Sequence, residues 1–175
     1  FIAGSLALVP LIGFSLFPDA DIPQFRITVE TPDGASLADT DRALRHVEEE
    51  LARRPEVKHW FANLGRGNPR VYYNIYPAET NANVAEVFAE LEHFDPRRSP
   101  VLYEELRAKF AEYPGARIMV ESFQNGPPID APIEVAIVGP DLEQLRALAA
   151  QAETLIEAVP GTRDVDNPVR RLRTD

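Results

Sequence analysis

The residue types that most often perform acid–base or metal chemistry are sparse in this chain of 175 residues. It contains three histidines, His46, His59 and His93, and no cysteine. No two of these histidines have the HExxH spacing with which one helix face binds zinc. The lack of cysteine excludes disulfides and thiolate metal sites. The sequence therefore predicts no catalytic centre, no resident metal and no cofactor.

A glycine-containing segment at residues 65–69 is the next candidate for chemistry. A phosphate-binding loop would need a third glycine, a following helix and a P-loop lysine, and this segment has none of them. An acylphosphatase-like hydrolase would need an arginine and an asparagine that cradle phosphate. Arg66 with Asn68, or Arg163 with Asn167, is too weakly placed to support that enzyme. The glycines allow either a hinge or a rigid turn.

Aromatic side chains are the strongest candidates for ligand binding. Phe61, Tyr73 and Phe123 fall on three different predicted strands of one structural unit. One interpretation is that rings of this kind fill the core. The other is that they line a cleft with a few polar groups, which suits varied apolar ligands.

Polar side chains accompany these rings. Because side chains alternate across a strand, Glu121 shares a face with Phe123, and Arg26 shares a face with Thr28. A helix-covered face of the sheet would already be core. We therefore expect these side chains to border one groove on the other face, capped by residues 65–69.

The elements that position these residues follow from hydrophobic periodicity and turn chemistry. Ser36 is the predicted N-cap of the first helix, with Asp39 in its first turn. The predicted strands are residues 25–31, 57–63, 70–76 and 116–123, and the predicted helices are residues 36–51, 84–91 and 99–110. The order β-α-β-β-α-β predicts an α+β, ferredoxin-like subdomain with a four-stranded antiparallel sheet and its helices on one face.

A second, incomplete unit follows the break Asn125-Gly126-Pro127-Pro128. We expect a strand over 132–138, a helix over 141–158 and a strand over 162–166. Leu142, Leu145, Leu148 and Leu155 are expected to point inward from that helix. The predicted division is therefore 18–128 for the first subdomain and 129–175 for the first part of a second.

Residues 1–17 carry no charge and end at Pro18-Asp19. They lack the basic start and the small-residue cleavage site of a signal peptide. A buried core helix is one alternative, but Gly4, Pro10 and Gly13 are costlier in a soluble helix than in a membrane helix. The favoured interpretation is the end of a transmembrane helix in a longer polypeptide.

Overall composition narrows the function further. With 45% hydrophobic and 26% charged residues, the chain has globular values. Its net charge of −10 argues against nucleic acid and anionic lipid headgroups as partners.

Two stretches, FPDADIPQFRITVETPDGAS and NGPPIDAPIEVAIVGPDLEQL, together with the βαββαβ order, resemble the resistance–nodulation–division efflux transporters. The resemblance covers nearly the whole chain and points to the second half of the permease, where a transmembrane helix enters the periplasmic porter domain. It implies an inner-membrane homotrimer, not an enzyme, that exports small molecules by proton flow. A periplasmic adaptor and an outer-membrane channel are the implied partners.

The same resemblance assigns roles to the candidate residues. Phe61 and Tyr73 match aromatics of the family's deep drug pocket, and Phe123 matches an outer-pocket aromatic. The loop that separates these pockets, the switch loop, corresponds to Gly65, Arg66, Gly67 and Asn68.

Departures from the family pattern concern polarity. Glu121 stands where drug pumps have a second aromatic, and Arg66 and Asn68 replace phenylalanines. Arg26 and Thr28 are expected to face the same cleft. These polar replacements suggest a more polar or cationic substrate, or a divergent branch of the family, and the expected cargo is small amphiphilic or cationic compounds. The alternative, from another class of function, is a membrane-tethered ferredoxin-like domain with a ligand-binding or regulatory role.

Overall fold

The computed structural model describes residues 18–127, 133–162 and 165–170. Its elements are β1 (Gln24–Glu30), α2 (Leu37–Ala52), β2 (Val57–Leu64), β3 (Val84–Leu91), α3 (Arg98–Ala111), β4 (Arg117–Ser122), α4 (Leu142–Glu157) and the 3₁₀ helix η1 (Pro168–Arg170). The predicted transmembrane segment, residues 1–17, lies outside the described residues. Among the helices that are described, none combines the length and apolarity needed to cross a bilayer.

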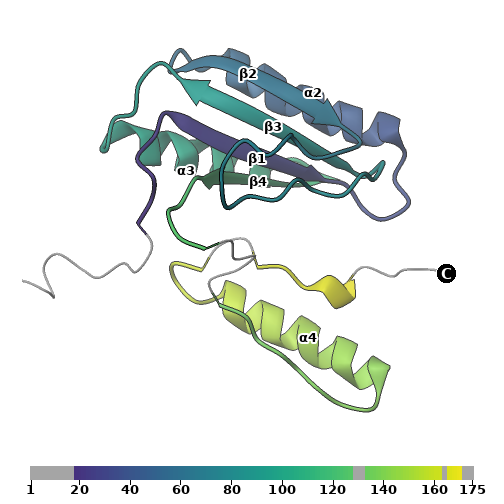
Figure 1. Ribbon diagram of the computed structural model, residues 1–175. Helices are drawn as coiled ribbons and strands as arrows, with labels where there is room; N and C mark the ends of the chain where they lie inside the picture. The colour runs from purple at the N-terminus through teal and green to yellow at the C-terminus, as the bar shows by residue number, and fades with distance from the viewer. Residues whose placement is uncertain (1–17, 128–132, 163–164, 171–175) are drawn as a thin grey trace, which may run out of the picture.

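Strands β1 to β4 form one antiparallel sheet in the order β2-β3-β1-β4. Helices α2 and α3 lie on the same face of this sheet (Figure 1). This is the arrangement of a ferredoxin-like βαββαβ unit. The fold class predicted from the sequence is confirmed.

The core lies between the sheet and these two helices. Phe25, Ile27 and Val29 alternate along β1 and are 0% exposed, so one face of the strand is buried completely. Apolar side chains from both helices pack against them: Ala43, Leu44, Val47 and Leu51 from α2, and Leu102, Tyr103, Leu106 and Phe110 from α3. Burial of this apolar surface is the main stabilising contribution to the subdomain.

The start of α2 is fixed by a reciprocal hydrogen-bond pair. The Asp39 amide donates to the Ser36 side chain, and the Ser36 amide donates to the Asp39 carboxylate at 2.9 Å. This capping box satisfies two backbone donors that the helix itself leaves unpaired. The predicted N-cap at Ser36 is confirmed.

The segment predicted as a helix over 84–91 is the central strand β3, and that prediction is wrong. Val84, Val87, Phe88 and Leu91 fit a helical period, and Ala and Glu are good helix formers. However, Ala85, Val87, Ala89 and Leu91 also alternate, and all four are buried against the helices. Hydrogen bonding to β1 on one side and β2 on the other overrides the local helical preference.

The predicted third strand over 70–76 is also wrong, because these residues are part of a loop. The segment is rich in β-formers, but Pro69 and Pro77 bracket it and cannot donate to a strand ladder. Its polar groups bind the residues after β4 instead, as described below.

The second unit is described only in part. Helix α4 lies where it was predicted, with Asp141 as N-cap accepting from the Gln144 amide at 3.0 Å. No strand forms among residues 133–138, 162 and 165–166. None of the α4 residues is buried, so the prediction that its leucines point inward is wrong for the described chain. An isolated strand has no ladder partner, and an unpartnered helix face stays exposed. The division at residue 128 remains a prediction.

An ion-pair network joins the start of β2 to α3 and predicts acid sensitivity. Arg98 donates to Glu56 at 2.7 Å and to Glu105 at 2.6 Å. The hydrogen bond from Arg98 lowers the pKa of Glu56. A folded-state pKa below the unfolded value contributes stability above the unfolded pKa, about 4.3, and this stability is lost as pH falls through the folded pKa.

We therefore expect Glu56→Gln to lower the free energy of unfolding at pH 7 by up to about 1 kcal/mol. The difference from the wild type should be smaller at about pH 3, because Glu56 becomes protonated, and so neutral like the glutamine amide, as pH falls through its lowered pKa. Denaturant unfolding at the two pH values measures this. The control is Glu92→Gln, at an exposed position. If Glu56→Gln lowers the free energy of unfolding equally at both pH values, the role assigned to Arg98 is contradicted.

Candidate functional site

The candidate site lies on the face of the sheet opposite α2 and α3, here called the open face. Because Ile27 and its alternating neighbours face the helices, Arg26 and Thr28 of β1 point the other way. In the register of the sheet, Arg26 lies between Phe88 of β3 and Glu121 of β4, and Thr28 lies beside Glu86 of β3. The central strand β3 therefore adds two residues to the predicted set.

Arg26 lies between two carboxylates. Its Nη2 and Nε donate to Oε2 of Glu121 at 2.8 Å and 3.1 Å. Its Nη1 lies 3.6 Å from Oε1 of Glu86, whose side chain is 3% exposed, whereas that of Glu121 is 40% exposed. Two carboxylates around one guanidinium leave the group with a formal negative charge. Glu121 is the member that a ligand in solvent can reach.

A row of aromatic rings crosses the same face. Phe61 lies 5.4 Å from Phe88 between ring centroids, and Phe88 lies 6.1 Å from Phe123. The ring of Tyr72 stacks on Phe123 at 4.9 Å and also lies 4.9 Å from that of Tyr73. We call these five residues the aromatic row. Phe61 and Tyr73, at 43% and 54% exposure, are its accessible ends, whereas Phe123 is 1% exposed.

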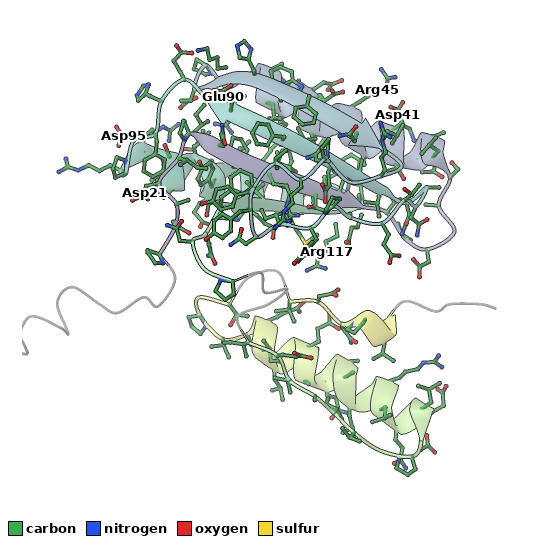
Figure 2. The ribbon with its side chains drawn as sticks, viewed as in Figure 1. Asp21, Asp41, Arg45, Glu90, Asp95 and Arg117 are labelled. Carbon is green, nitrogen blue, oxygen red and sulfur yellow. The ribbon has the colours of Figure 1, made fainter. Side chains whose placement is uncertain are left out.

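The connection between β2 and β3, residues 65–83, passes across the open face (Figure 1), and we call it the crossing loop. Figure 2 shows side chains gathered where this loop lies in front of β1 and β4. Its two arms are joined by backbone hydrogen bonds from Asn81 to Gly65 at 3.1 Å and from Gly67 to Ala78 at 3.3 Å. The predicted switch loop is therefore only the first part of a longer loop.

The tip of the crossing loop is tied to the residues after β4. Asn74 Nδ2 donates to the carbonyls of Gln124 at 2.9 Å and Gly126 at 3.1 Å. The Gly126 amide in turn donates to the Tyr73 hydroxyl at 2.7 Å. The Tyr72 hydroxyl donates to Asn125 Oδ1 at 3.1 Å. These contacts hold Tyr72 in its stacked position.

Asn68 connects the loop to the charged group. It is 2% exposed, and its backbone amide donates to Glu86 Oε2 at 2.7 Å. Its Oδ1 accepts from Asn63 Nδ2 at 2.7 Å. Its neighbour Arg66 is exposed. Asn68 therefore holds the crossing loop against the buried carboxylate, and Arg66 remains accessible to solvent.

The structure brings most of the predicted residues together on the open face. Arg26 and Glu121 are in direct contact, and Phe61, Tyr73 and Phe123 all belong to the aromatic row. Tyr72 of the crossing loop occupies the space beside Phe123. Glu121 and the two ends of the row therefore offer the accessible surface.

Sequence reasoning missed Glu86 and Phe88, because they lie in the segment that was predicted as a helix. The signal that could have identified them is the alternation of Ala85, Val87, Ala89 and Leu91, which assigns the intervening positions to the other face. No group of three or more histidine or carboxylate side chains able to hold a metal occurs within residues 18–127, 133–162 and 165–170.

A sequence profile described as the AcrB/AcrD/AcrF family matches residues 1–171. The chain belongs to this family. The resemblance inferred from the sequence motifs is therefore confirmed, and the family is one of transporters rather than of enzymes. No curated protein sequence matches the chain.

Among solved structures, a heavy metal efflux pump matches the fold with a TM-score of 0.60 and 20% sequence identity. The match covers 93% of this chain and 18% of that pump, so the chain spans less than a fifth of the pump's length. A hydantoinase/carbamoylase family amidase from Burkholderia ambifaria also matches, at 18% identity over 75% of this chain and 33% of the amidase. Its TM-score of 0.32 is too low to indicate a shared fold. For this member of the AcrB/AcrD/AcrF family, the structural likeness supports the fold.

The close approach of the loop's two arms gives a testable prediction. A Cβ atom on Gly67 would lie 2.3 Å from the backbone nitrogen of Ala78, which cannot move aside as a flexible side chain can. We expect Gly67→Ala to destabilise the protein by about 1–3 kcal/mol and to speed amide exchange in residues 68–76. Thermal unfolding and hydrogen exchange measure the two effects.

The control is Gly139→Ala, where the added Cβ meets only Leu145 side-chain carbons at 3.4 Å and beyond. Unchanged loop exchange in the Gly67→Ala protein would show that the arms are not held together as described.

Proposed function

We propose that the chain is part of the substrate-binding and translocating porter domain of a proton-driven efflux pump. Membership in the AcrB/AcrD/AcrF family supports an efflux transporter, and the ferredoxin-like fold fits a porter subdomain. The open face is the surface that contacts the substrate. The division into one subdomain at 18–128 and the start of a second at 129–175 belongs to the same proposal.

The observation that carries this proposal is the Arg26 group beside the aromatic row. Glu86 and Glu121 outnumber the guanidinium that they flank, so the surface attracts positive charge. The exposed rings of Phe61 and Tyr73 offer apolar area and, through their π faces, a further attraction for cations. Small amphiphilic or cationic compounds fit this combination.

Arg66, Thr28 and the rest of the predicted loop have supporting roles in this proposal. Arg66 is exposed on the crossing loop, where its positive charge would repel a cation. Thr28 is 7% exposed, so it acts by packing beside Glu86 rather than by direct contact. Gly65 and Gly67 set the path of the crossing loop, and Asn68 fixes it to β3.

The proposed assembly and cellular location are those of the efflux transporter family. The full-length permease would form a homotrimer in the bacterial inner membrane, with this segment mainly in the periplasm. A periplasmic adaptor and an outer-membrane channel would complete the export path. Proton coupling would reside in transmembrane segments of the permease.

Export assays with variants of the full-length transporter test the role of the open face. Glu121→Gln should lower export of a cationic compound about 2- to 5-fold and leave a neutral analogue of similar size unchanged, because an exposed charge pair contributes little but acts on charge alone. Phe61→Ala should weaken export of both compounds, since a ring contributes contact area.

Phe61 is a cleaner probe than Phe123, whose loss would also remove a side chain that is 1% exposed from the fold. Glu92→Gln, an exposed acid outside the open face, is the matched control. An equal loss for charged and neutral compounds in Glu121→Gln would mean that this carboxylate is structural, and the substrate proposal would fail.

A further inference from the structure

The crossing loop has a firmly held base and a more weakly attached tip. At the base, the Asn68 amide donates to the buried Glu86 carboxylate at 2.7 Å, and backbone hydrogen bonds join the two arms. The tip, residues 70–76, is attached to residues 124–126 by hydrogen bonds that are mostly exposed to solvent. Exposed hydrogen bonds are exchanged for bonds to water at little net cost. The tip can therefore open while the base stays in place.

The tip places a ring of its own on the open face. Tyr72 stacks on Phe123 with 4.9 Å between the ring centroids and an interplanar angle of 16°. Phe123 is 1% exposed, so its ring is closed to solvent, and the Tyr72 ring covers one of its two faces. The crossing loop thus occupies one aromatic position of the open face with a side chain of the same protein.

Asn74 holds the tip in this position, and one of its own atoms is left unsatisfied there. Its Nδ2 donates to the carbonyls of Gln124 at 2.9 Å and Gly126 at 3.1 Å. Its Oδ1 is buried and has no hydrogen-bond partner among the described residues. An unsatisfied buried acceptor costs free energy, and opening of the tip would return this oxygen to water. The bonds that close the tip are therefore partly offset by the bond that Asn74 does not make.

We propose that residues 70–76 are a removable cover of the open face, and that Asn74 is the positioning residue that keeps the Tyr72 ring on Phe123. When the cover opens, the face of the Phe123 ring becomes available to a ligand. Because flat rings stack on one another, a planar aromatic group is the best replacement for the Tyr72 ring. The inference rests on the proposed function for the role of the open face, and it adds that a ligand reaches Phe123 only after this side chain is displaced.

Asn74→Asp in the full chain tests whether this residue holds the cover. At pH 7 the carboxylate has the shape of the amide but cannot donate to the two carbonyls. Amide exchange in residues 70–76 should become about tenfold faster, and the nuclear Overhauser contacts between the rings of Tyr72 and Phe123 should weaken. Asn81→Asp is the matched control, because it adds the same charge to the same loop at an exposed side chain.

Binding of the fluorescent aromatic probe N-phenyl-1-naphthylamine measures whether the covered surface becomes accessible. The probe is neutral, so the added charge of a variant has little direct effect on its binding. Its affinity should rise about 3- to 10-fold in Asn74→Asp and in Tyr72→Ala, because the binding-competent state is then more populated, and it should stay unchanged in Asn81→Asp. Loss of an aromatic contact weakens binding, whereas loss of a cover strengthens it, so the Tyr72→Ala variant separates the two roles.

Three results would overturn the cover. They are unchanged amide exchange in Asn74→Asp, a lower probe affinity in Tyr72→Ala, and a rise in affinity that the Asn81→Asp control shares. The export assays with Glu121→Gln and Phe61→Ala test the proposed function separately, because neither change removes a hydrogen bond of the tip. A failure of the cover is therefore distinguishable from a failure of the proposed function.

Discussion

The pairing of β3 with β1 on one side and β2 on the other is the constraint on which the rest of the structure depends. A central strand has its backbone groups bonded on both edges, so its register is fixed and its side chains must alternate. That alternation sends Ala85, Val87 and Ala89 into the core and Glu86 and Phe88 to the open face. Core and candidate site are thus two consequences of one ladder.

Because Glu86 is buried in that ladder, its negative charge must be compensated by groups on the open face. A carboxylate that is 3% exposed needs compensation, which comes from Arg26 and from the backbone amide of Asn68. Because Arg26 also binds Glu121, a single guanidinium serves both acids. The crossing loop is thereby part of the electrostatics of the sheet, and its position is set by charge as well as by packing.

Local features were predictable from the sequence, whereas long-range ones were predictable only in part. The cap at Ser36 and the helix that follows Asp141 depend on residues a few positions apart, so the sequence identifies them. Residues 84–91 satisfy both a helical and a strand period, and only pairing with strands distant in sequence decides between them. The contact of Arg26 with Glu86 follows from that pairing. The stacking of Tyr72 on Phe123 depends on hydrogen bonds between the tip of the crossing loop and a segment 50 residues later in the chain. Both contacts were therefore missed.

The hydrogen bonds between Asn74, Tyr73 and residues 124–126 join two segments that the chain uses for different purposes. One segment covers the open face, and the other leads from β4 towards α4. Because the same bonds would have to break for either segment to move alone, the two form one mechanical unit. A rotation of the chain beyond residue 126 would strain these hydrogen bonds, so the position of the crossing loop depends on the segment that follows β4.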